Sequence, residues 1–294
     1  MALNILTFDI EEWYIEQAFG GGRSDKYQQF DTKLKELLDA LDETQMQATF
    51  FCLGELASQF PQVVKLIHSR NHHIGCHSNR HMWLSKMMPA ELKEDTRLAI
   101  DSLQQCVGEA VDAYRAPAFS IGNSNSWAFE VLSENGVKID ASVFPAERDF
   151  GGFSSFAHKT PSIIQIGNAT IKEMPIRTTP ILGKEIAFSG GGYFRFFPYR
   201  FISGKVAQSD YTMTYFHIGD LVAEESRLMS RKEYESYFKE SGTLVNRTKR
   251  YVKSNLGKKR AFDKLCRLLK AHNFVSVAQA DSLIEWNTAP TIKL

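Results

Sequence analysis

Two histidines, His77 and His81, lie four residues apart, so their imidazoles can share a metal ion if the segment is helical. An acidic group near the amino terminus contains Asp9, Glu11 and Glu12. Two imidazoles and one carboxylate form a ligand set that suits zinc or another divalent ion and leaves positions for water and substrate. Taken singly, each group is better explained as solvated polar residues, so the prediction depends on the fold bringing them together.

The candidate residues follow short apolar segments that are typical of buried strands. Arg115 and His217 end two further segments of this kind. In a parallel α/β fold, ligands bind at the carboxyl ends of the strands. We therefore expect the acidic group, the two neighbouring histidines, Arg115 and His217 to meet at one edge of a sheet. The segments are residues 3–8, 48–53, 74–76, 113–115 and 212–217.

Helical patterns alternate with these strands, which favours a parallel sheet and most economically a (β/α) barrel. Leucines within residues 34–41 recur at helical spacing, and Asp31 before them is predicted to cap that helix. Residues 150–200 are rich in Gly, Pro, Phe and Thr and are predicted to form a loop or β-hairpin insertion. No repeat or evident linker divides the chain, so residues 1–294 are predicted to form a single domain.

The composition excludes several classes of protein. The chain has 294 residues, of which 43% are hydrophobic, so it contains enough apolar material for a sizeable core and is not largely disordered. Its 35 basic residues nearly balance its 34 acidic residues, and the net charge is +1. Because no overall positive field attracts polyanions, we expect no binding to nucleic acid.

The cysteines and the amino terminus predict the compartment. The cysteines are widely spaced and form no Cys-x-x-Cys pair, so reduced thiols are expected rather than a disulfide framework. The first residues lack the basic and long apolar regions of a signal peptide, and no run of ~20 apolar residues is present. We therefore expect a soluble, cytoplasmic protein. The cysteines are Cys52, Cys76, Cys106 and Cys266.

Three motifs in this chain resemble, in order and spacing, the first three motifs of the polysaccharide deacetylases (carbohydrate esterase family four). They are T-F-D-I-E-E-W-Y at residues 7–14, H-S-N-R-H at 77–81 and Y-R-A-P-A-F at 114–119. Further matches at 139–145, 190–195 and 215–217 resemble the branch found in bacterial exopolysaccharide and surface-glycan gene clusters. The resemblance covers about residues 3–220.

The resemblance implies a distorted (β/α) barrel of about seven strands that removes N-acetyl groups from amino sugars at one divalent metal ion. On this model the metal is zinc, with cobalt or another divalent ion as the alternative, and His77 and His81 bind it. Many relatives have two adjacent aspartates, the first a base and the second a ligand, whereas Ile10 follows Asp9 here. Alternation along the strand places Asp9 and Glu11 on one face, so we assign Asp9 as base and Glu11 as ligand. The alternative ligand is Glu12.

Two further residues receive catalytic roles from the resemblance. Arg115 is expected to hold Asp9 ionised and oriented through a bidentate contact that a lysine cannot reproduce. His217 is expected to act as the general acid that protonates the leaving amine, because an imidazole titrates near neutral pH.

Substrate contacts are predicted from aromatic residues that can stack on sugar rings. Asp140 is expected to bind substrate or to orient Arg115 or His217. The chain lacks the Asp-x-x-Asp-Trp form of many relatives there, and Ile218-Gly219-Asp220 stands where relatives often have Pro-Trp-Glu. The aromatic candidates are Trp13, Tyr14, Trp83, Phe119 and Tyr193.

The expected partner is an amino-sugar glycan or a lipid-linked or nucleotide-linked precursor of one. Residues 247–270 are strongly basic and are predicted to be a solvated helix face; the alternative is contact with an anionic lipid-linked glycan or the membrane surface. Two other functions stay open. The same metal site can act on a small cyclic amide or a formamido group, or the barrel can bind glycan without turnover.

Overall fold

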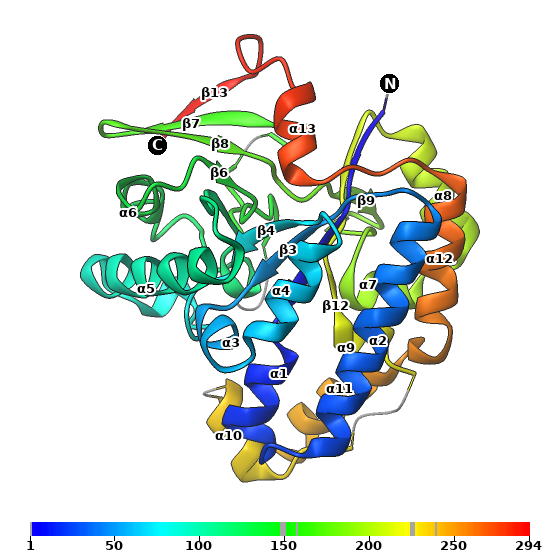
Figure 1. The fold of residues 1–294 in the computed structure, drawn as a ribbon. Helices are drawn as coiled ribbons and strands as arrows, with labels where there is room; N and C mark the ends of the chain where they lie inside the picture. Colours follow the sequence, from blue (N-terminus) through cyan, green and yellow to red (C-terminus); the bar gives the residue numbers. More distant parts are fainter. Residues whose placement is uncertain (1, 148–150, 157, 224–226, 239) are drawn as a thin grey trace.

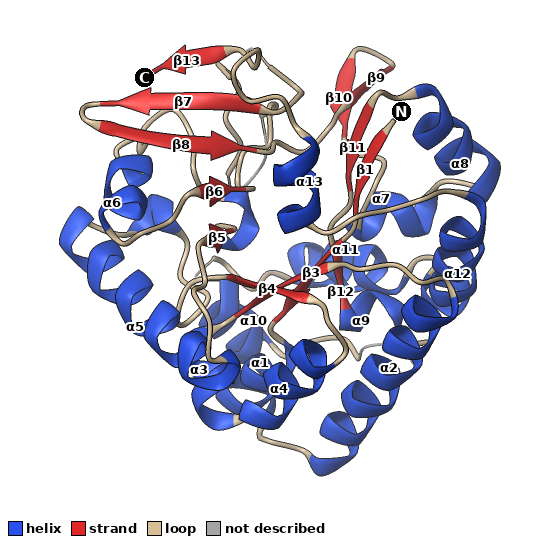
Figure 2. Cartoon of the chain, turned by 45° about the horizontal axis from the view of Figure 1, so that its top comes forward, coloured by secondary structure: helices blue, strands red, loops and turns tan. Residues whose placement is uncertain are grey.

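The computed structural model describes residues 2–147, 151–156, 158–223, 227–238 and 240–294. A curved sheet is surrounded by helices on its outer side, as Figures 1 and 2 show. Neighbouring strands are parallel from β12 to β8, which gives seven parallel strands. In spatial order the sheet contains β12 (Phe216–His217), β2 (Thr7–Ile10), β3 (Thr49–Cys52), β4 (His73–Cys76), β5 (Ala113–Tyr114), β6 (Ile139–Asp140), β8 (Ala169–Glu173), β7 (Ser162–Ile166) and β13 (Thr291–Lys293).

The predicted fold, an α/β distorted barrel of about seven strands, is confirmed. Strands β2 and β3 are buried at every position, because helices cover one side and the barrel interior fills the other. Strand β1 (Leu3–Ile5) runs directly before β2 and pairs with β11 (Tyr211–Met213). Within the described residues no backbone pairing joins β8 to β12, so the barrel is distorted at this side.

The predicted insertion contains two antiparallel hairpins, but its last part is helical and not a loop, because α7 (Gly191–Phe196) and the start of α8 (Tyr199–Gln208) lie in it. One hairpin is β7 with β8, and the other is β9 (Thr179–Ile181) with β10 (Lys184–Ile186). The first residue of the predicted segment, Phe150, lies outside the described residues.

The longest helices pack on the outside of the barrel through rows of leucine and other apolar residues. Helix α2 buries Leu34, Leu37, Leu38 and Leu41 as expected, but it begins at Ser24, so Asp31 lies within the helix and is not its cap. The α-helices are α1 (Glu12–Ile15), α2 (Ser24–Glu43), α3 (Gly54–Gln59), α4 (Pro61–Ser69), α5 (Pro89–Val107), α6 (Ala128–Glu134), α7 (Gly191–Phe196), α8 (Tyr199–Gln208), α9 (Ile218–Leu221), α10 (Arg231–Phe238), α11 (Leu244–Asn255), α12 (Ala261–Ala271) and α13 (Val277–Leu283).

The described part of the chain contains neither a disulfide bond nor a candidate membrane-spanning helix. All four cysteines are free thiols. None of the helices described there combines the length and the apolar character that crossing a bilayer requires.

Candidate active site

Glu11, His77 and His81 form a compact cluster at the carboxyl ends of β2 and β4. Oε2 of Glu11 lies 2.7 Å from Nε2 of His81 and 3.7 Å from Nε2 of His77. One ligand atom from each of the three side chains lies within 4.8 Å of the others. Two imidazoles and a carboxylate at this spacing fit a divalent cation with three protein ligands.

The two histidines meet because of a strained loop rather than a helix. Residues 77–81 are not helical, so the two imidazoles do not meet on a shared helix face. Ser78 and His81 instead have φ values of 70° and 57°, in the left-handed region that non-glycine residues rarely occupy. Oγ of Ser78 accepts a hydrogen bond from the His81 backbone N–H at 3.0 Å, and Asp95 accepts one from Asn79 at 2.8 Å. Such strain is typical of functional sites.

A hydrogen bond fixes the orientation of His77. Its Nδ1 lies 2.8 Å from the backbone carbonyl of Arg115, which can only accept, so Nδ1 carries the proton. Nε2 therefore keeps its lone pair and faces Glu11. This is the second contact that metal-binding histidines ordinarily make, and it supports the fit of the cluster to a metal.

Asp9 is buried beside the cluster and is held by Arg115, whose side chain is fully buried. Nη1 of Arg115 lies 2.9 Å from Oδ1 of Asp9 and 2.6 Å from Oγ1 of Thr7. Its Nε donates to the Ala141 carbonyl at 3.2 Å. The expected pairing of Arg115 with Asp9 is present, but it uses one nitrogen. The bidentate geometry was wrong, because the other donors bind elsewhere.

His217 lies across from Asp9 because β12 pairs in parallel with β2 and the two residues are register partners. Its Nε2 lies 4.0 Å from Oδ2 of Asp9 and 3.9 Å from Oε1 of Glu11. About one third of the side chain is exposed, at 34%. Burial by itself lowers the pKa of His217, but the nearby Glu11 and Asp220 carboxylates outweigh it and hold that pKa well above its usual value.

Asp220 and Arg195 complete the site and were missed in the sequence. Oδ2 of Asp220 accepts hydrogen bonds from Nδ1 and the backbone N–H of His217, at 3.1 and 3.2 Å. Nε of Arg195 lies 3.1 Å from Oδ1 of Asp220. Burial raises the pKa of Asp220, but His217 and Arg195 lower it below the usual range. The three-residue spacing of a helix cap, from His217 to Asp220, was the available signal.

Glu12 is not one of the three clustered residues, so the structure favours Glu11 over the alternative ligand Glu12. Its Oε1 accepts a hydrogen bond from the Gly219 backbone N–H at 2.5 Å. Burial raises the pKa of Glu12 to about 7. Burial by itself would raise the pKa of Glu11 as well. The nearby His81 and His217 outweigh it and hold the pKa of Glu11 well below its usual value. Glu11 is therefore the carboxylate suited to a cation.

Several residues expected to contact substrate lie in the core. Trp13 is 1% exposed and its Nε1 donates to Asp31 at 3.0 Å, so it offers no face to a sugar and that prediction was wrong. Phe119 is also buried, packed edge-on against Tyr215. Tyr14 is half-buried and Tyr193 is exposed.

Asp140 is also corrected, because it is fully buried and cannot contact substrate. Its oxygens accept from the backbone N–H and Oγ of Ser142 at 2.8 and 2.7 Å. Oγ of Ser142 in turn accepts from the backbone N–H of Ala116, next to Arg115. Asp140 therefore supports the backbone beside Arg115, and the carboxylate on His217 is that of Asp220.

A polar groove of about 440 Å³ lies along the loops that follow His81 and Phe119. Trp83 supplies an aromatic face there, with Nζ of Lys86 4.3 Å from its ring centre. Hydroxyl and amide groups around an aromatic face are the groups that bind sugars. The groove is lined by Trp83, Ser85, Lys86, Ser120, Gly122, Asn123, Ser124, Asn125, Gly151, Gly152 and Glu240.

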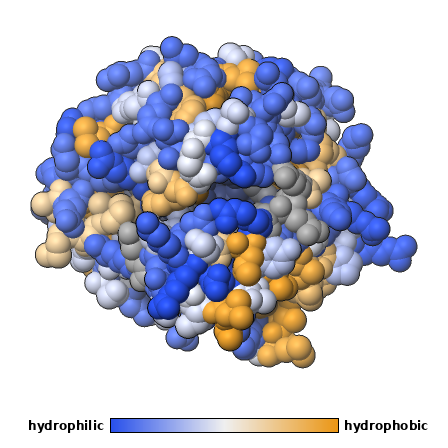
Figure 3. Space-filling view, turned by 90° about the horizontal axis from the view of Figure 1, so that it is seen from below, coloured by the Kyte–Doolittle hydropathy of each residue, from blue (hydrophilic) through white to orange (hydrophobic). Residues whose placement is uncertain are grey.

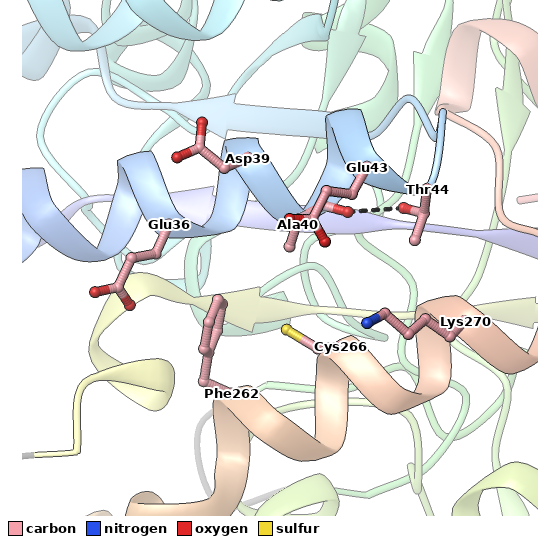
Figure 4. A pocket seen from close by; sticks show the side chains of 8 residues that line it. All are labelled: Glu36, Asp39, Ala40, Glu43, Thr44, Phe262, Cys266 and Lys270. Atoms are coloured by element: carbon pink, nitrogen blue, oxygen red, sulfur yellow. Dashed lines mark hydrogen bonds between the residues drawn. The ribbon is translucent and has the colours of Figure 1, made fainter.

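A second crevice, of about 280 Å³, lies between α2 and α12, away from the strand ends (Figure 4). Its carboxylates come from one helix, as Glu36, Asp39 and Glu43, and Lys270 lies on the facing helix. No described histidine lines it. The chemistry therefore favours the strand-end cluster as the functional site.

Comparison with protein families divides the chain near its middle. Residues 5–139 match the family model described as polysaccharide deacetylase, and residues 141–282 match a domain of unknown function, DUF3473. Glu11, His77, His81 and Arg115 lie in the first segment, whereas His217 lies in the second. The site is therefore built from both matched segments.

Individual relatives match shorter stretches. A peptidoglycan-N-acetylglucosamine deacetylase of Bacillus cereus is 35% identical over 96 residues, which cover 32% of this chain and 35% of that protein. A chitooligosaccharide deacetylase of Bradyrhizobium sp. is 24% identical over 98 residues, which cover 33% of this chain and 42% of that protein. The chain thus spans less than half the length of these curated relatives.

A solved structure matches over the whole chain. A Mycobacterium smegmatis protein assigned to the polysaccharide deacetylases has a TM-score of 0.67 and is 16% identical, covering 100% of this chain and 93% of that chain. At this identity the match concerns the fold alone, and it agrees with the distorted barrel described above.

Proposed function

We propose that the chain is a metal-dependent hydrolase of the polysaccharide deacetylase family, because residues 5–139 match the model of that family. Its reaction is the removal of the N-acetyl group from an N-acetylamino sugar in a glycan or glycan precursor. One observation carries the proposal: Glu11, His77 and His81 converge beside a buried Asp9 and a partly exposed His217. The first three fit a cation, and the other two fit proton transfer.

We propose that Glu11, His77 and His81 hold one divalent cation, with zinc the best match for two imidazoles and one carboxylate. When bound, the cation polarises the amide carbonyl and lowers the pKa of a water molecule at the site. Such assistance is needed because an amide carbonyl is a poor electrophile.

The chain's own residues then handle the protons. Oδ2 of Asp9 accepts a proton from the attacking water, while Oδ1 stays bound to Arg115, which holds the carboxylate ionised and in place. Nε2 of His217 gives a proton to the sugar nitrogen as the carbon–nitrogen bond breaks. The carboxylate of Asp220, hydrogen-bonded to Nδ1, favours the protonated imidazole that this step requires. One water is consumed, and acetate and the free amine are released.

The groove beside Trp83 is the proposed position of the neighbouring sugar rings. Its first lining residue, Trp83, follows His81 by two residues in the chain, which supports a place for the glycan beside the proposed cation site. The hydroxyl and amide side chains of Ser85, Asn123 and Ser124 suit a neutral sugar chain.

The test is acetate release from N-acetylglucosamine oligomers by the full chain loaded with zinc or cobalt. We expect one bound ion per chain and acetate as product, and His217→Ala is expected to slow turnover by ~10²–10⁴-fold. Release of formate, or ring opening without acetate, would instead identify a formamido or cyclic-amide substrate. Absence of bound metal, with glycan binding unchanged in Asp9→Ala, would identify a binding protein.

A further inference from the structure

Helix α11 presents an apolar row to solvent. No residue of this helix is buried. Leu244 is 62% exposed and Val252 is 52% exposed, and Leu256, directly after the helix, is 49% exposed. With Thr248, these residues follow one another at steps of four positions, so they form one inclined ridge on the surface of the helix. Val245, at 60% exposed, widens this row at its start.

A row of positive charge runs alongside the apolar row. Lys249 and Lys253 are exposed, and each lies three positions before a member of the apolar row, Val252 or Leu256. Because residues three apart are neighbours on a helix surface, the two rows are adjacent. Residues 241–262 contain seven basic residues and no acidic residue, in a chain whose net charge is +1. The basic residues are Arg247, Lys249, Arg250, Lys253, Lys258, Lys259 and Arg260.

The opposite face of α11 is held against the protein, so the apolar row cannot turn inward. The guanidinium of Arg250 lies 4.2 Å from the ring centre of Phe238 on α10. Nη2 of Arg195 donates to the Lys253 carbonyl at 3.0 Å, and Nη1 donates to the Ser254 carbonyl. Helices α10 and α11 lie at the lower end of the molecule in Figure 1, and Figure 3 shows hydrophobic and strongly hydrophilic side chains side by side on this end.

We propose that the outer face of α11 is a docking surface for an anionic lipid bilayer. A helix with an apolar row beside lysines binds in the interfacial plane, where apolar side chains enter the acyl boundary and lysines contact anionic headgroups. A nucleic acid or an acidic polysaccharide requires the charges but not the exposed leucines and valines. This proposal goes beyond the deacetylase activity and does not rest on it.

The carboxyl end of α11 is also linked to the proposed active site. Arg195 contacts the carboxyl end of α11 and, through its Nε, Asp220, the residue that holds His217. Arg195 therefore connects the backbone of α11 to the residue that holds His217.

The experiment measures sedimentation of the full chain with vesicles of phosphatidylcholine alone or of phosphatidylcholine mixed with phosphatidylglycerol. We expect binding to the mixed vesicles only. Lys249→Gln with Lys253→Gln is expected to weaken it about 25-fold, at about 5-fold for each lysine. Val252→Asn with Leu256→Asn is expected to weaken it by about 10-fold, because two half-exposed apolar side chains no longer enter the bilayer.

Matched controls carry the same changes on other helices and loops. Lys35→Gln with Lys65→Gln removes two exposed lysines from α2 and α4, and Leu182→Asn with Leu283→Asn removes two exposed leucines. Both control pairs are expected to bind as the unmodified chain does, and thermal unfolding checks that every variant is folded. Absent binding to the mixed vesicles, or losses no larger than in the controls, would overturn the proposal. If the lysine variant bound more weakly and the apolar variant bound normally, the proposal would also be overturned, because the partner would then be recognised by charge alone.

Discussion

Asp220 offers the sharpest test of the proposed proton transfers, through the variant Asp220→Asn. The carboxylate binds Nδ1 of His217 at 3.1 Å on one oxygen and Nε of Arg195 at 3.1 Å on the other. Asparagine keeps the size of the side chain and a carbonyl oxygen that can accept the proton of Nδ1. The substitution therefore removes the negative charge beside His217. It also places an amide NH2 donor opposite Nε of Arg195, so the Arg195 contact is lost as well.

The expected size of the effect follows from the type of hydrogen bond. A hydrogen bond to a charged group contributes about 1.5–3 kcal/mol, and one between neutral groups about 0.5–1.5 kcal/mol. The difference of about 1–1.5 kcal/mol corresponds to about one pKa unit. Asp220 and Glu11 together hold the pKa of His217 well above its usual value, so Asp220→Asn is expected to lower that pKa by about one unit.

The assay is the pH dependence of acetate release from N-acetylglucosamine oligomers at saturating zinc. His217 must carry a proton to give it to the leaving amine, so the rate falls as pH rises through its pKa. A lower pKa moves this alkaline fall to lower pH by about one unit. Turnover at the optimum is expected to drop about 10-fold, less than the ~10²–10⁴-fold loss in His217→Ala.

Arg195→Gln is the matched control for Asp220→Asn. It removes the other partner of Asp220 and disturbs the same segment, but it leaves the carboxylate on His217. In this variant the rate should fall at the same alkaline pH as in the unmodified chain, even if the melting temperature is lower. If the alkaline fall in the rate of Asp220→Asn stayed at the same pH, Asp220 would not position His217 for proton transfer. A loss of turnover as large as in His217→Ala would refute that role too.

Three further predictions concern the ligands, the base and a buried histidine. Glu11→Gln is expected to weaken zinc binding more than about 100-fold by calorimetry, whereas Glu12→Gln costs less than about 10-fold, because only Glu11 lies in the cluster. Asp9→Asn should abolish turnover and leave zinc affinity mostly intact; equal loss of both would make Asp9 a ligand. Burial lowers the pKa of His72 from 6.5 to about 4, so unfolding takes up a proton below pH 6.5. The free energy of unfolding should fall by up to about 3 kcal/mol from pH 6.5 to 4, and denaturant titrations of His72→Asn should show a flatter dependence.

Much of the site could be predicted because its polar residues stand at the ends of short apolar strands. Asp9, His77 and Arg115 each follow a short apolar segment, and parallel pairing brings such ends to one edge. His217 reaches the same edge because β12 pairs with β2 in register. These placements follow from the apolar pattern of each strand and from the parallel strand topology, and the sequence indicates both.

Contacts made by long side chains were not predictable in the same way. Trp13 was expected to stack on a sugar and Asp31 to cap a helix, yet the two side chains hydrogen-bond to each other in the structure. Each residue type fits its expected role equally well in isolation, so only tertiary packing decides. Likewise, Arg195 reaches Asp220 across a segment in which no periodic pattern links the two.

The boundary between the two matched segments, after residue 139, falls inside the barrel rather than between two units. Strand β12 of the second segment pairs with β2 of the first. The second segment also supplies acceptors for buried donors of the first: Nε of Arg115 donates to the Ala141 carbonyl at 3.2 Å, and the Thr7 backbone N–H donates to Oγ1 of Thr214 at 3.0 Å. These contacts favour the proposal of one domain over residues 1–294.

A fragment of residues 1–140 tests this proposal. Without the second segment, β2 has an open edge, and each buried donor that loses its acceptor costs about 1–3 kcal/mol. That cost is large beside the ~5–15 kcal/mol by which native domains are stable, so we expect no cooperative unfolding transition for the fragment. We also expect no acetate release, because the fragment lacks His217. A fragment that unfolds cooperatively and binds zinc as tightly as the full chain would show that the first segment is an independent domain, with residues 141–282 an addition to it.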